Sequence, residues 1–275
     1  MIAAATQLLA CCTNLYANPL IELLVGDSFH PGGRAGSRAL LSAAALPMGA
    51  RLLDVGSGLG TSARLAAAEF GLRVDAVDVS DAIVKRGRAR GPSARVQWTV
   101  AALPRLPFPD HSFDAVLAEC VLSTTERSAA LAEIARVLRP GGLLLISDVE
   151  TESLDFGSEL EPVVGAALCL SEAWLVGEMD RLLADLGFDQ TNRWNRSTDI
   201  VEMIDRAEAR IGFVRVAATG LGIDLKDLLA AIGEPAWGAD DQRLQTTVAG
   251  IRRAVAEGSL RYSALIAAAP LEAAS

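Results

Sequence analysis

The sequence has few of the residues that mark several classes of protein. Its four cysteines, two of them adjacent, do not suggest a disulfide framework, so we expect reduced thiols, as in a cytoplasm. Hydrophobic residues make up 51% of the chain but aromatic residues only 5%, which indicates a core of alanine, leucine and valine. The net charge of −9 is the opposite of what phosphate backbones favour, so we expect no nucleic-acid partner.

Long apolar stretches are also missing, and none is long enough to cross a membrane. The motif L-L-A-C at 8–11 is similar to a lipoprotein cleavage site. However, no lysine or arginine precedes it, and its apolar run of about ten residues is short for a signal peptide. We interpret this segment as an amphipathic helix and expect a cytoplasmic protein. A chain of 275 residues is long enough for one large domain or for a domain with a cap.

One motif, L-L-D-V-G-S-G-L-G-T at 52–61, carries the most information. Its apolar run around Asp54 is typical of a buried parallel strand. A helix is predicted over 61–70, so the turn before it would present free backbone N–H groups. Three glycines let this turn bend sharply and approach a ligand closely: Gly56, Gly58 and Gly60.

A second predicted strand, Val74 to Val79, places the carboxylate of Asp78 where it can bond to both hydroxyls of a ribose. The G-x-G-x-G spacing differs from the dinucleotide fingerprint, G-x-G-x-x-G. Asp54 would repel a pyrophosphate but could bind an ammonium group. The pattern therefore indicates a nucleoside-containing cofactor, and the alternative is a strand-to-helix turn in another kind of α/β protein.

Four motifs over roughly residues 45–190 resemble those of the class I S-adenosylmethionine-dependent methyltransferases. They are D-V-G-S-G-L-G-T at 54–61, D-A-V-D-V-S at 75–80, L-P-F-P-D-H-S-F-D-A-V at 106–116 and L-A-E-I-A-R-V-L-R-P-G-G-L-L-L-I-S-D at 131–148. The resemblance implies an α/β, Rossmann-like fold with a mostly parallel seven-stranded sheet. It also implies the cofactor S-adenosyl-L-methionine, with S-adenosyl-L-homocysteine as the product.

The resemblance also implies which residues bind the cofactor. Asp78 would hold the ribose, Val79 would pack on the adenine, and Glu119 lies at the same edge of the sheet. The family commonly has an aspartate near the adenine amino group, where this chain has Ala101 and Ala102, so contact there would use backbone atoms. The methionine end would be held by Asp54, Gly56, Ser57, Gly58, Gly60 and Thr61.

The chain is predicted to have four parts. These are an N-terminal helical lid (1–48), a cofactor-binding core (49–197), a helical insertion (198–258), and the last strand with its tail (259–275). We predict strands near 51–55, 73–79, 95–100, 113–118, 142–149, 190–195 and 261–267, and a helix over 171–187 ended by Gly187. In the insertion we predict helices over 200–211, 225–232 and 248–255, which would shape a substrate pocket or a homodimer contact.

The chemistry expected of such an enzyme is in-line transfer of a methyl group to a small-molecule acceptor. A hydroxyl or ammonium acceptor must lose a proton, so a general base is expected. His30 in the lid is a candidate because imidazole titrates near neutrality, and the alternative is a capping role. Glu119, at the end of the fourth strand, and Tyr16, in the lid, are further candidates. His111 is interpreted as a surface turn residue.

Two other functions stay open. A-E-C-V-L-S at 118–123, C-L-S-E-A-W at 169–174 and L-G-F at 186–188 resemble arsenite methyltransferases, in which Cys120 and Cys169 would be soft ligands of the metalloid. By the same resemblance, Cys11 or Cys12 would supply a third thiol. The alternative is that these cysteines are small buried apolar residues. No resident metal ion is predicted. The remaining candidate is a cofactor-binding protein without transfer activity.

Overall fold

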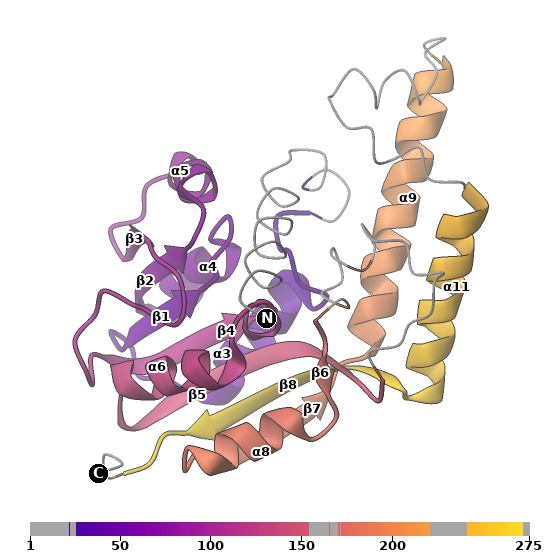
Figure 1. The fold of residues 1–275 in the computed structure, drawn as a ribbon. Helices are drawn as coiled ribbons and strands as arrows, with labels where there is room; N and C mark the ends of the chain where they lie inside the picture. Colours follow the sequence, from indigo (N-terminus) through magenta and orange to yellow (C-terminus); the bar gives the residue numbers. More distant parts are fainter. Residues whose placement is uncertain are drawn as a thin grey trace.

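A twisted β-sheet with helices on both faces forms the centre of the protein (Figure 1). The computed structural model describes residues 22, 26–153, 165, 170, 172–220 and 241–271. Its elements are α3 (Gly33–Ala44), β1 (Arg51–Val55), α4 (Thr61–Glu69), β2 (Arg73–Asp78), α5 (Asp81–Ala89), β3 (Val96–Val100), β4 (Phe113–Glu119), η1 (Leu122–Thr124), α6 (Arg127–Val137), β5 (Leu138–Thr151), β6 (Trp174–Leu175), α8 (Glu178–Asp185), β7 (Asp189–Asn195), α9 (Thr198–Gly220), α11 (Asp241–Glu257) and β8 (Leu260–Ala268).

The strands follow the order β3-β2-β1-β4-β5-β8-β7, and the two-residue β6 pairs with the end of β5. Strands β1 to β5 are parallel, whereas β8 is antiparallel to both of its neighbours. The predicted mostly parallel, Rossmann-like sheet is therefore confirmed, with β6 as an addition to its seven strands. The order reverses between β1 and β4, and such a switch point opens a crevice at the carboxyl ends of the strands.

The apolar residues of the strands fill a core on each face of the sheet. On one face Leu53 and Val116 pack with Ile134 of α6. On the other face Leu52 and Leu117 pack with residues of α3 and α4, among them Leu41. Because both faces are covered, the central strands are almost continuously apolar. This apolar pattern explains why the strand boundaries predicted from the sequence agree closely with the structure.

The prediction of one helix over 171–187 is wrong for the first half of this range. Trp174 and Leu175 instead form β6, which pairs with Glu150 and Thr151 at the end of β5. Trp174 is fully buried there, so pairing and burial prevail over the local helical pattern. The helix α8 starts only after Gly177, and Gly187 does lie just beyond its end, as predicted.

Helices α9 and α11 run side by side away from the sheet (Figure 1). The predicted helices over 200–211 and 248–255 lie within them, and the one over 225–232 lies outside the described residues. Ile200 and Ile251 pack with Tyr262 of β8, which anchors the pair to the sheet. Arg206 of α9 also donates a hydrogen bond to the carbonyl oxygen of Pro31, 3.2 Å away.

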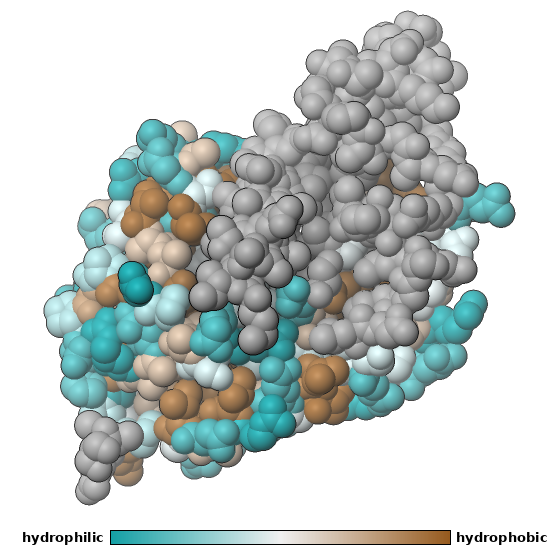
Figure 2. All heavy atoms as spheres, in the orientation of Figure 1, coloured by the Kyte–Doolittle hydropathy of each residue, from teal (hydrophilic) through white to brown (hydrophobic). Residues whose placement is uncertain are grey.

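Among the coloured residues on the face shown in Figure 2, apolar residues form separate patches between hydrophilic ones. None of the helices in the described part of the chain has both the length and the apolar character that crossing a membrane requires.

Candidate functional site

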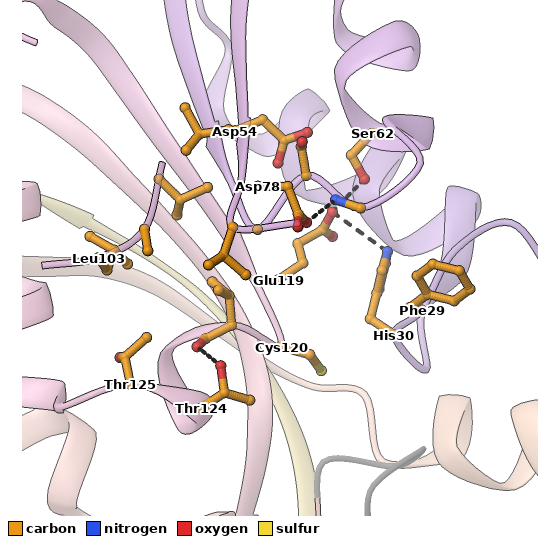
Figure 3. A pocket seen from close by; sticks show the side chains of 18 of the residues that line it. Phe29, His30, Asp54, Ser62, Asp78, Leu103, Glu119, Cys120, Thr124 and Thr125 are labelled. Carbon is orange, nitrogen blue, oxygen red and sulfur yellow. Dashed lines mark hydrogen bonds and ion pairs between the residues drawn. The ribbon is translucent and has the colours of Figure 1, made fainter. Parts of the chain in front are cut away.

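A cavity of about 830 Å³ lies at the carboxyl ends of β1, β2 and β4, where the strand order reverses. Its wall is formed by the β1–α4 turn, the ends of β2 and β4, and the two loops 27–30 and 101–106. Figure 3 shows that side chains from these separate segments converge on one space. Cavities of roughly 300–1,000 Å³ are typical of small-molecule sites.

The β1–α4 turn has room only for glycine at two of its positions. A Cβ atom at Gly56 would lie 2.5 Å from Cγ2 of Val121, and one at Gly60 would lie 2.2 Å from Cη2 of Trp98. Both residues also have positive φ angles, +65° and +73°. The predicted sharp turn is therefore present, and its backbone forms part of the cavity wall.

Asp54, at the end of β1, is an acid in a strongly unfavourable environment. Its side chain is only 3% exposed, and its Oδ2 atom has no hydrogen-bond partner among the described residues. Burial raises the pKa of this carboxyl well above its usual value, and the charges of Glu119 and Asp78 raise it further. Because Asp54 also lines the cavity, a ligand that donates a charged hydrogen bond would satisfy the unpaired oxygen.

Asp78 ends β2 and is held by backbone donors. Its two oxygens accept hydrogen bonds from the N–H groups of Gly58, at 3.0 Å, and Ser80, at 2.9 Å. Burial raises the pKa of Asp78, and these two hydrogen bonds lower it in part. Val79 is 39% exposed and lines the cavity together with Ala102, as do Ser57 and Thr61 of the glycine turn.

Glu119 lies at the end of β4 and is surrounded by hydroxyl groups. Ser62 donates to its Oε2 at 2.6 Å, and Ser37 donates to both of its oxygens at 2.9 and 3.0 Å. The Nε2 atom of His30 lies 3.5 Å from Oε2, and Figure 3 shows the two side chains facing each other beside Ser62. The sequence placed both residues at the site but did not indicate that they would meet.

Cys120 follows Glu119 and also lines the cavity. It adopts a φ of +51°, which is uncommon for a side chain other than glycine, and its N–H donates to the carbonyl oxygen of Ser147 at 2.8 Å. His111 instead lies in an exposed turn before β4 and does not line the cavity, in agreement with its prediction as a surface residue.

Four of the proposed site residues lie outside the described residues: Cys11, Cys12, Tyr16 and Cys169. Within the part of the chain that is described, no group of three or more histidine, cysteine, aspartate or glutamate side chains is arranged to hold a metal ion.

Sequence reasoning missed Ser37, Ser62, Phe29 and Tyr262. Phe29 and Ser62 line the cavity, and Ser62 follows Thr61 in the first turn of α4, which is a local signal that could have found it. Tyr262 lies on β8, 232 residues from His30, and no local pattern links the two.

Comparison with known proteins identifies the domain. A family described as "Methyltransferase domain" matches residues 53–146. An uncharacterized methyltransferase of Bacillus subtilis, YodH, is 32% identical over 167 residues, which cover 59% of this chain and 70% of that protein. An arsenite methyltransferase of Halobacterium salinarum is 30% identical over 187 residues, which cover 64% of this chain and 47% of that protein.

Solved structures agree on the fold. Phosphoethanolamine N-methyltransferase 2 of Haemonchus contortus, in complex with S-adenosyl-L-methionine, aligns with a TM-score of 0.71 at 23% identity, over 94% of this chain and 57% of that one. The [4+2]-cyclase SpnF aligns with a TM-score of 0.63 at 24% identity, over 87% of this chain and 81% of that one.

This chain spans about half the length of the first curated relatives that it matches, between 47% and 55%. The fold, the matched domain and the extended similarity to YodH nevertheless agree with one another. The chain belongs to the class I S-adenosylmethionine-dependent methyltransferase family.

Proposed function

We propose that the protein binds S-adenosylmethionine in this cavity and transfers its methyl group to a small-molecule acceptor, leaving S-adenosylhomocysteine. The observation that carries the proposal is the buried carboxylate of Asp54, which lines the cavity beside the glycine turn. Its Oδ2 has no partner in the described part of the chain. An amino acid ammonium group would supply the missing donor and the compensating positive charge.

The other residues of the cavity fit the rest of the cofactor. Within the described part of the chain Asp78 accepts two hydrogen bonds. A carboxylate has about four acceptor positions, so Asp78 can also accept from ribose hydroxyls. The half-exposed side chain of Val79 offers an apolar surface for a purine, and the backbone around Ala102 offers polar groups that could contact its edge. When bound, the cofactor supplies an electrophilic methyl group on sulfur, and the protein's part is to hold the acceptor close and in line.

The charges around the cavity favour an acceptor that is neutral or cationic. Asp54, Asp78 and Glu119 are all buried or nearly so at this wall, and the arginines among the described residues that line the cavity are Arg127 and Arg181. Arg127, at the far side of the cavity, is already paired with Glu178 at 2.6 Å. An acceptor with a negative charge next to these three carboxylates would therefore meet repulsion.

Binding of S-adenosylmethionine to the wild-type protein and to Asp78→Ala tests the proposal. We expect the variant to bind about 10-fold or more weakly in isothermal titration calorimetry, because charged hydrogen bonds contribute about 1.5–3 kcal/mol each. Asp81→Ala is the matched control, since Asp81 pairs with Lys85 on the surface and does not line the cavity. Absence of binding to the wild-type protein, or equal loss in both variants, would contradict the proposal.

A metalloid acceptor is the second candidate, because Cys120 lines the cavity and the Halobacterium relative is named as an arsenite methyltransferase. Incubation with arsenite, glutathione and S-adenosylmethionine tests it directly. Formation of methylated arsenic by the wild-type protein, and its loss in Cys120→Ser, would support the metalloid function. If the wild-type protein forms no methylated arsenic, the metalloid function is refuted and an organic acceptor is favoured.

We propose that the segment before α3 is the lid, since α3 itself packs Leu40 and Leu41 into the core. Glu22 forms ion pairs with Arg86 of α5, at 2.6 Å, and with Arg90, which follows this helix. Asp27 to His30, further along the chain, line the cavity. The hydroxyl of Thr61 also donates to the carbonyl oxygen of Asp27, at 2.7 Å. These contacts would hold the segment over the cofactor.

Glu22→Gln tests the lid. We expect S-adenosylmethionine to dissociate about 2- to 5-fold faster in stopped-flow measurements, because half-exposed ion pairs contribute up to about 1 kcal/mol. The control is Glu69→Gln, since Glu69 also pairs with two arginines, Arg34 and Arg38, but does not line the cavity. The same dissociation rate in Glu22→Gln and the wild-type protein would refute the lid.

The helical pair α9 and α11 remains our proposed contact for a homodimer. Phe213 and Val216 of α9 are 75% and 73% exposed, and large apolar side chains of this kind favour an interface.

A further inference from the structure

Glu119 is the third carboxylate of the cavity wall, after Asp54 and Asp78. In the proposed binding mode, Asp54 faces the ammonium group of the cofactor and Asp78 faces its ribose hydroxyls. The product S-adenosylhomocysteine carries the same two groups. The side chain of Glu119 lines the same cavity and is only 7% exposed. A buried carboxylate is costly without a compensating positive charge, so a ligand that brings one close to Glu119 gains affinity.

Hydroxyl groups hold the Glu119 carboxylate without neutralising it. Ser62 donates to Oε2 at 2.6 Å, and Ser37 donates to the same carboxylate at 2.9 Å. Among the described residues, the basic side chain in contact with it is His30, whose Nε2 lies 3.5 Å from Oε2 (Figure 3). This distance is longer than the roughly 2.7–2.9 Å of a charge-assisted hydrogen bond. The two serines therefore orient the carboxylate, and most of its charge stays available to a ligand.

The negative charge of Glu119 acts on groups of other strands. Burial raises the pKa of Asp54, on β1, and the charge of Glu119 raises it further. Burial and the charge of Cys120 raise the pKa of Tyr262, on β8, and Glu119 adds to this effect as well. A cation bound in the part of the cavity next to Asp54 would therefore also be attracted by Glu119.

The cofactor has a second cation besides its ammonium group. The sulfur of S-adenosylmethionine is a sulfonium with a full positive charge. Methyl transfer leaves the electron pair of the broken C–S bond on sulfur, so the thioether of S-adenosylhomocysteine is neutral. Two methylene groups separate this sulfur from the carbon that bears the ammonium group. An ammonium group held at Asp54 thus leaves the sulfonium within the range over which Glu119 acts on Asp54.

We propose that Glu119 is the residue that distinguishes the cofactor from its product, because its carboxylate attracts the sulfonium and has no such attraction for the neutral thioether. Ser37 and Ser62 are positioning residues that hold the carboxylate in place. Loss of the sulfonium charge on transfer weakens the hold of the cavity on the product, which favours its release. This inference rests on the proposed function, since it requires the cofactor to bind in this cavity.

Isothermal titration calorimetry with three ligands tests the inference without a methyl acceptor. S-adenosylmethionine and sinefungin are both cationic at the position in question, and sinefungin has an ammonium group there in place of the methylated sulfur. S-adenosylhomocysteine is neutral at that position. We expect the wild-type protein to bind each cationic ligand about 10-fold more tightly than the neutral one. Agreement between the two cationic ligands separates the effect of charge from that of the methyl group.

Glu119→Gln removes the charge and keeps the size of the side chain. We expect its preference for the two cationic ligands over S-adenosylhomocysteine to fall about 10-fold, to nearly equal affinities. Asp78→Asn is the matched control, because Asp78 faces the ribose, which all three ligands share. Its three affinities should fall by the same factor, so the preference for the cationic ligands should be that of the wild-type protein.

A folded Glu119→Gln variant in which all three affinities fall by one factor would give Glu119 a merely structural role and overturn the inference. Equal affinities of the wild-type protein for the three ligands would also overturn it, and this result does not depend on the folding of a variant. In both cases the cofactor site itself would stand. Failure of the wild-type protein to bind any of the three ligands would refute the proposed function and this inference with it.

Discussion

Asp54→Asn is expected to make the ligand-free protein more stable and its binding of S-adenosylmethionine weaker. The wild-type carboxylate is buried and lies near the charges of Glu119 and Asp78, and one of its oxygens has no partner among the residues that the structure describes. A neutral amide removes the buried charge, and we expect a gain of about 1–3 kcal/mol in the free energy of unfolding, the usual cost of such an unsatisfied group. Loss of a charged hydrogen bond should weaken cofactor binding about 10- to 100-fold.

The pH dependence of stability has a definite sign. The folded protein holds the Asp54 proton more tightly than the unfolded chain, because burial raises the pKa of this carboxyl. Protonation of Asp54 therefore favours the folded state below about pH 4, and this contribution to the free energy of unfolding is lost as the pH rises through the raised pKa. In Asp54→Asn this decrease in stability with rising pH should be absent, because the amide does not titrate. Thermal denaturation between pH 4 and 8, with and without S-adenosylmethionine, measures both effects.

Asp75→Asn is the matched control for this experiment. Asp75 lies on the neighbouring strand opposite Leu53, pairs with Arg51 at 3.0 Å, and does not line the cavity. Its replacement should lower stability slightly and leave cofactor affinity unchanged. If Asp54→Asn also proved less stable than the wild-type protein, with unchanged affinity, Asp54 would be a structural residue.

Gly87→Ala and Gly212→Ala are expected to change stability in opposite directions. Both glycines lie within helices, α5 and α9, where alanine alone would gain about 0.5–1 kcal/mol. At Gly212 a Cβ atom would meet no atom of the described residues within 4 Å, so the full gain is expected. At Gly87 it would lie 2.5 Å from Cη2 of Trp98, and overpacking of this kind costs about 1–3 kcal/mol.

The effect at Gly87 should reach the cofactor. The Trp98 ring lies between Gly87 and Gly60, and a Cβ atom at Gly60 would be only 2.2 Å from the same Cη2 atom. The ring therefore cannot move away from α5 without approaching the glycine turn. We expect Gly87→Ala to weaken S-adenosylmethionine binding as well as stability. Chemical denaturation measures the stability of both variants, and Trp98→Leu should relieve the cost at Gly87. Equal effects of the two alanines would contradict this account.

The sequence predicted those parts of the fold that depend on local pattern. The apolar runs of β1, β2 and β4 are buried on both faces. Few residue types other than glycine could adopt the positive φ angles of the glycine turn. The carboxyl ends of parallel strands share an edge, so Asp54, Asp78 and Glu119 could be placed near one another in advance. Helix α8 was placed too early because the pairing of β6 with β5 is a long-range contact.

The candidate site was predicted only in part, for a similar reason. The His30, Ser37 and Glu119 side chains meet because α3 packs against the sheet, and Tyr262 joins them because β8 is inserted antiparallel beside β5. None of these contacts leaves a periodic or spaced pattern in the sequence. The assignment of His30 and Glu119 as candidate bases came from their residue types and their expected locations, and their roles stay predictions.

The helical pair α9 and α11 joins the sheet away from the part that forms the cavity wall. The chain enters α9 from β7 and returns from α11 into β8, so the insertion joins the sheet on the side away from β1, β2 and the glycine turn. Its contacts toward the cavity, through Arg206 to Pro31 and through β8 to Tyr262, reach the region around His30. Changes in α9 and α11 could therefore accumulate among relatives while the glycine turn and the ends of β1 and β2 at the cavity stay the same.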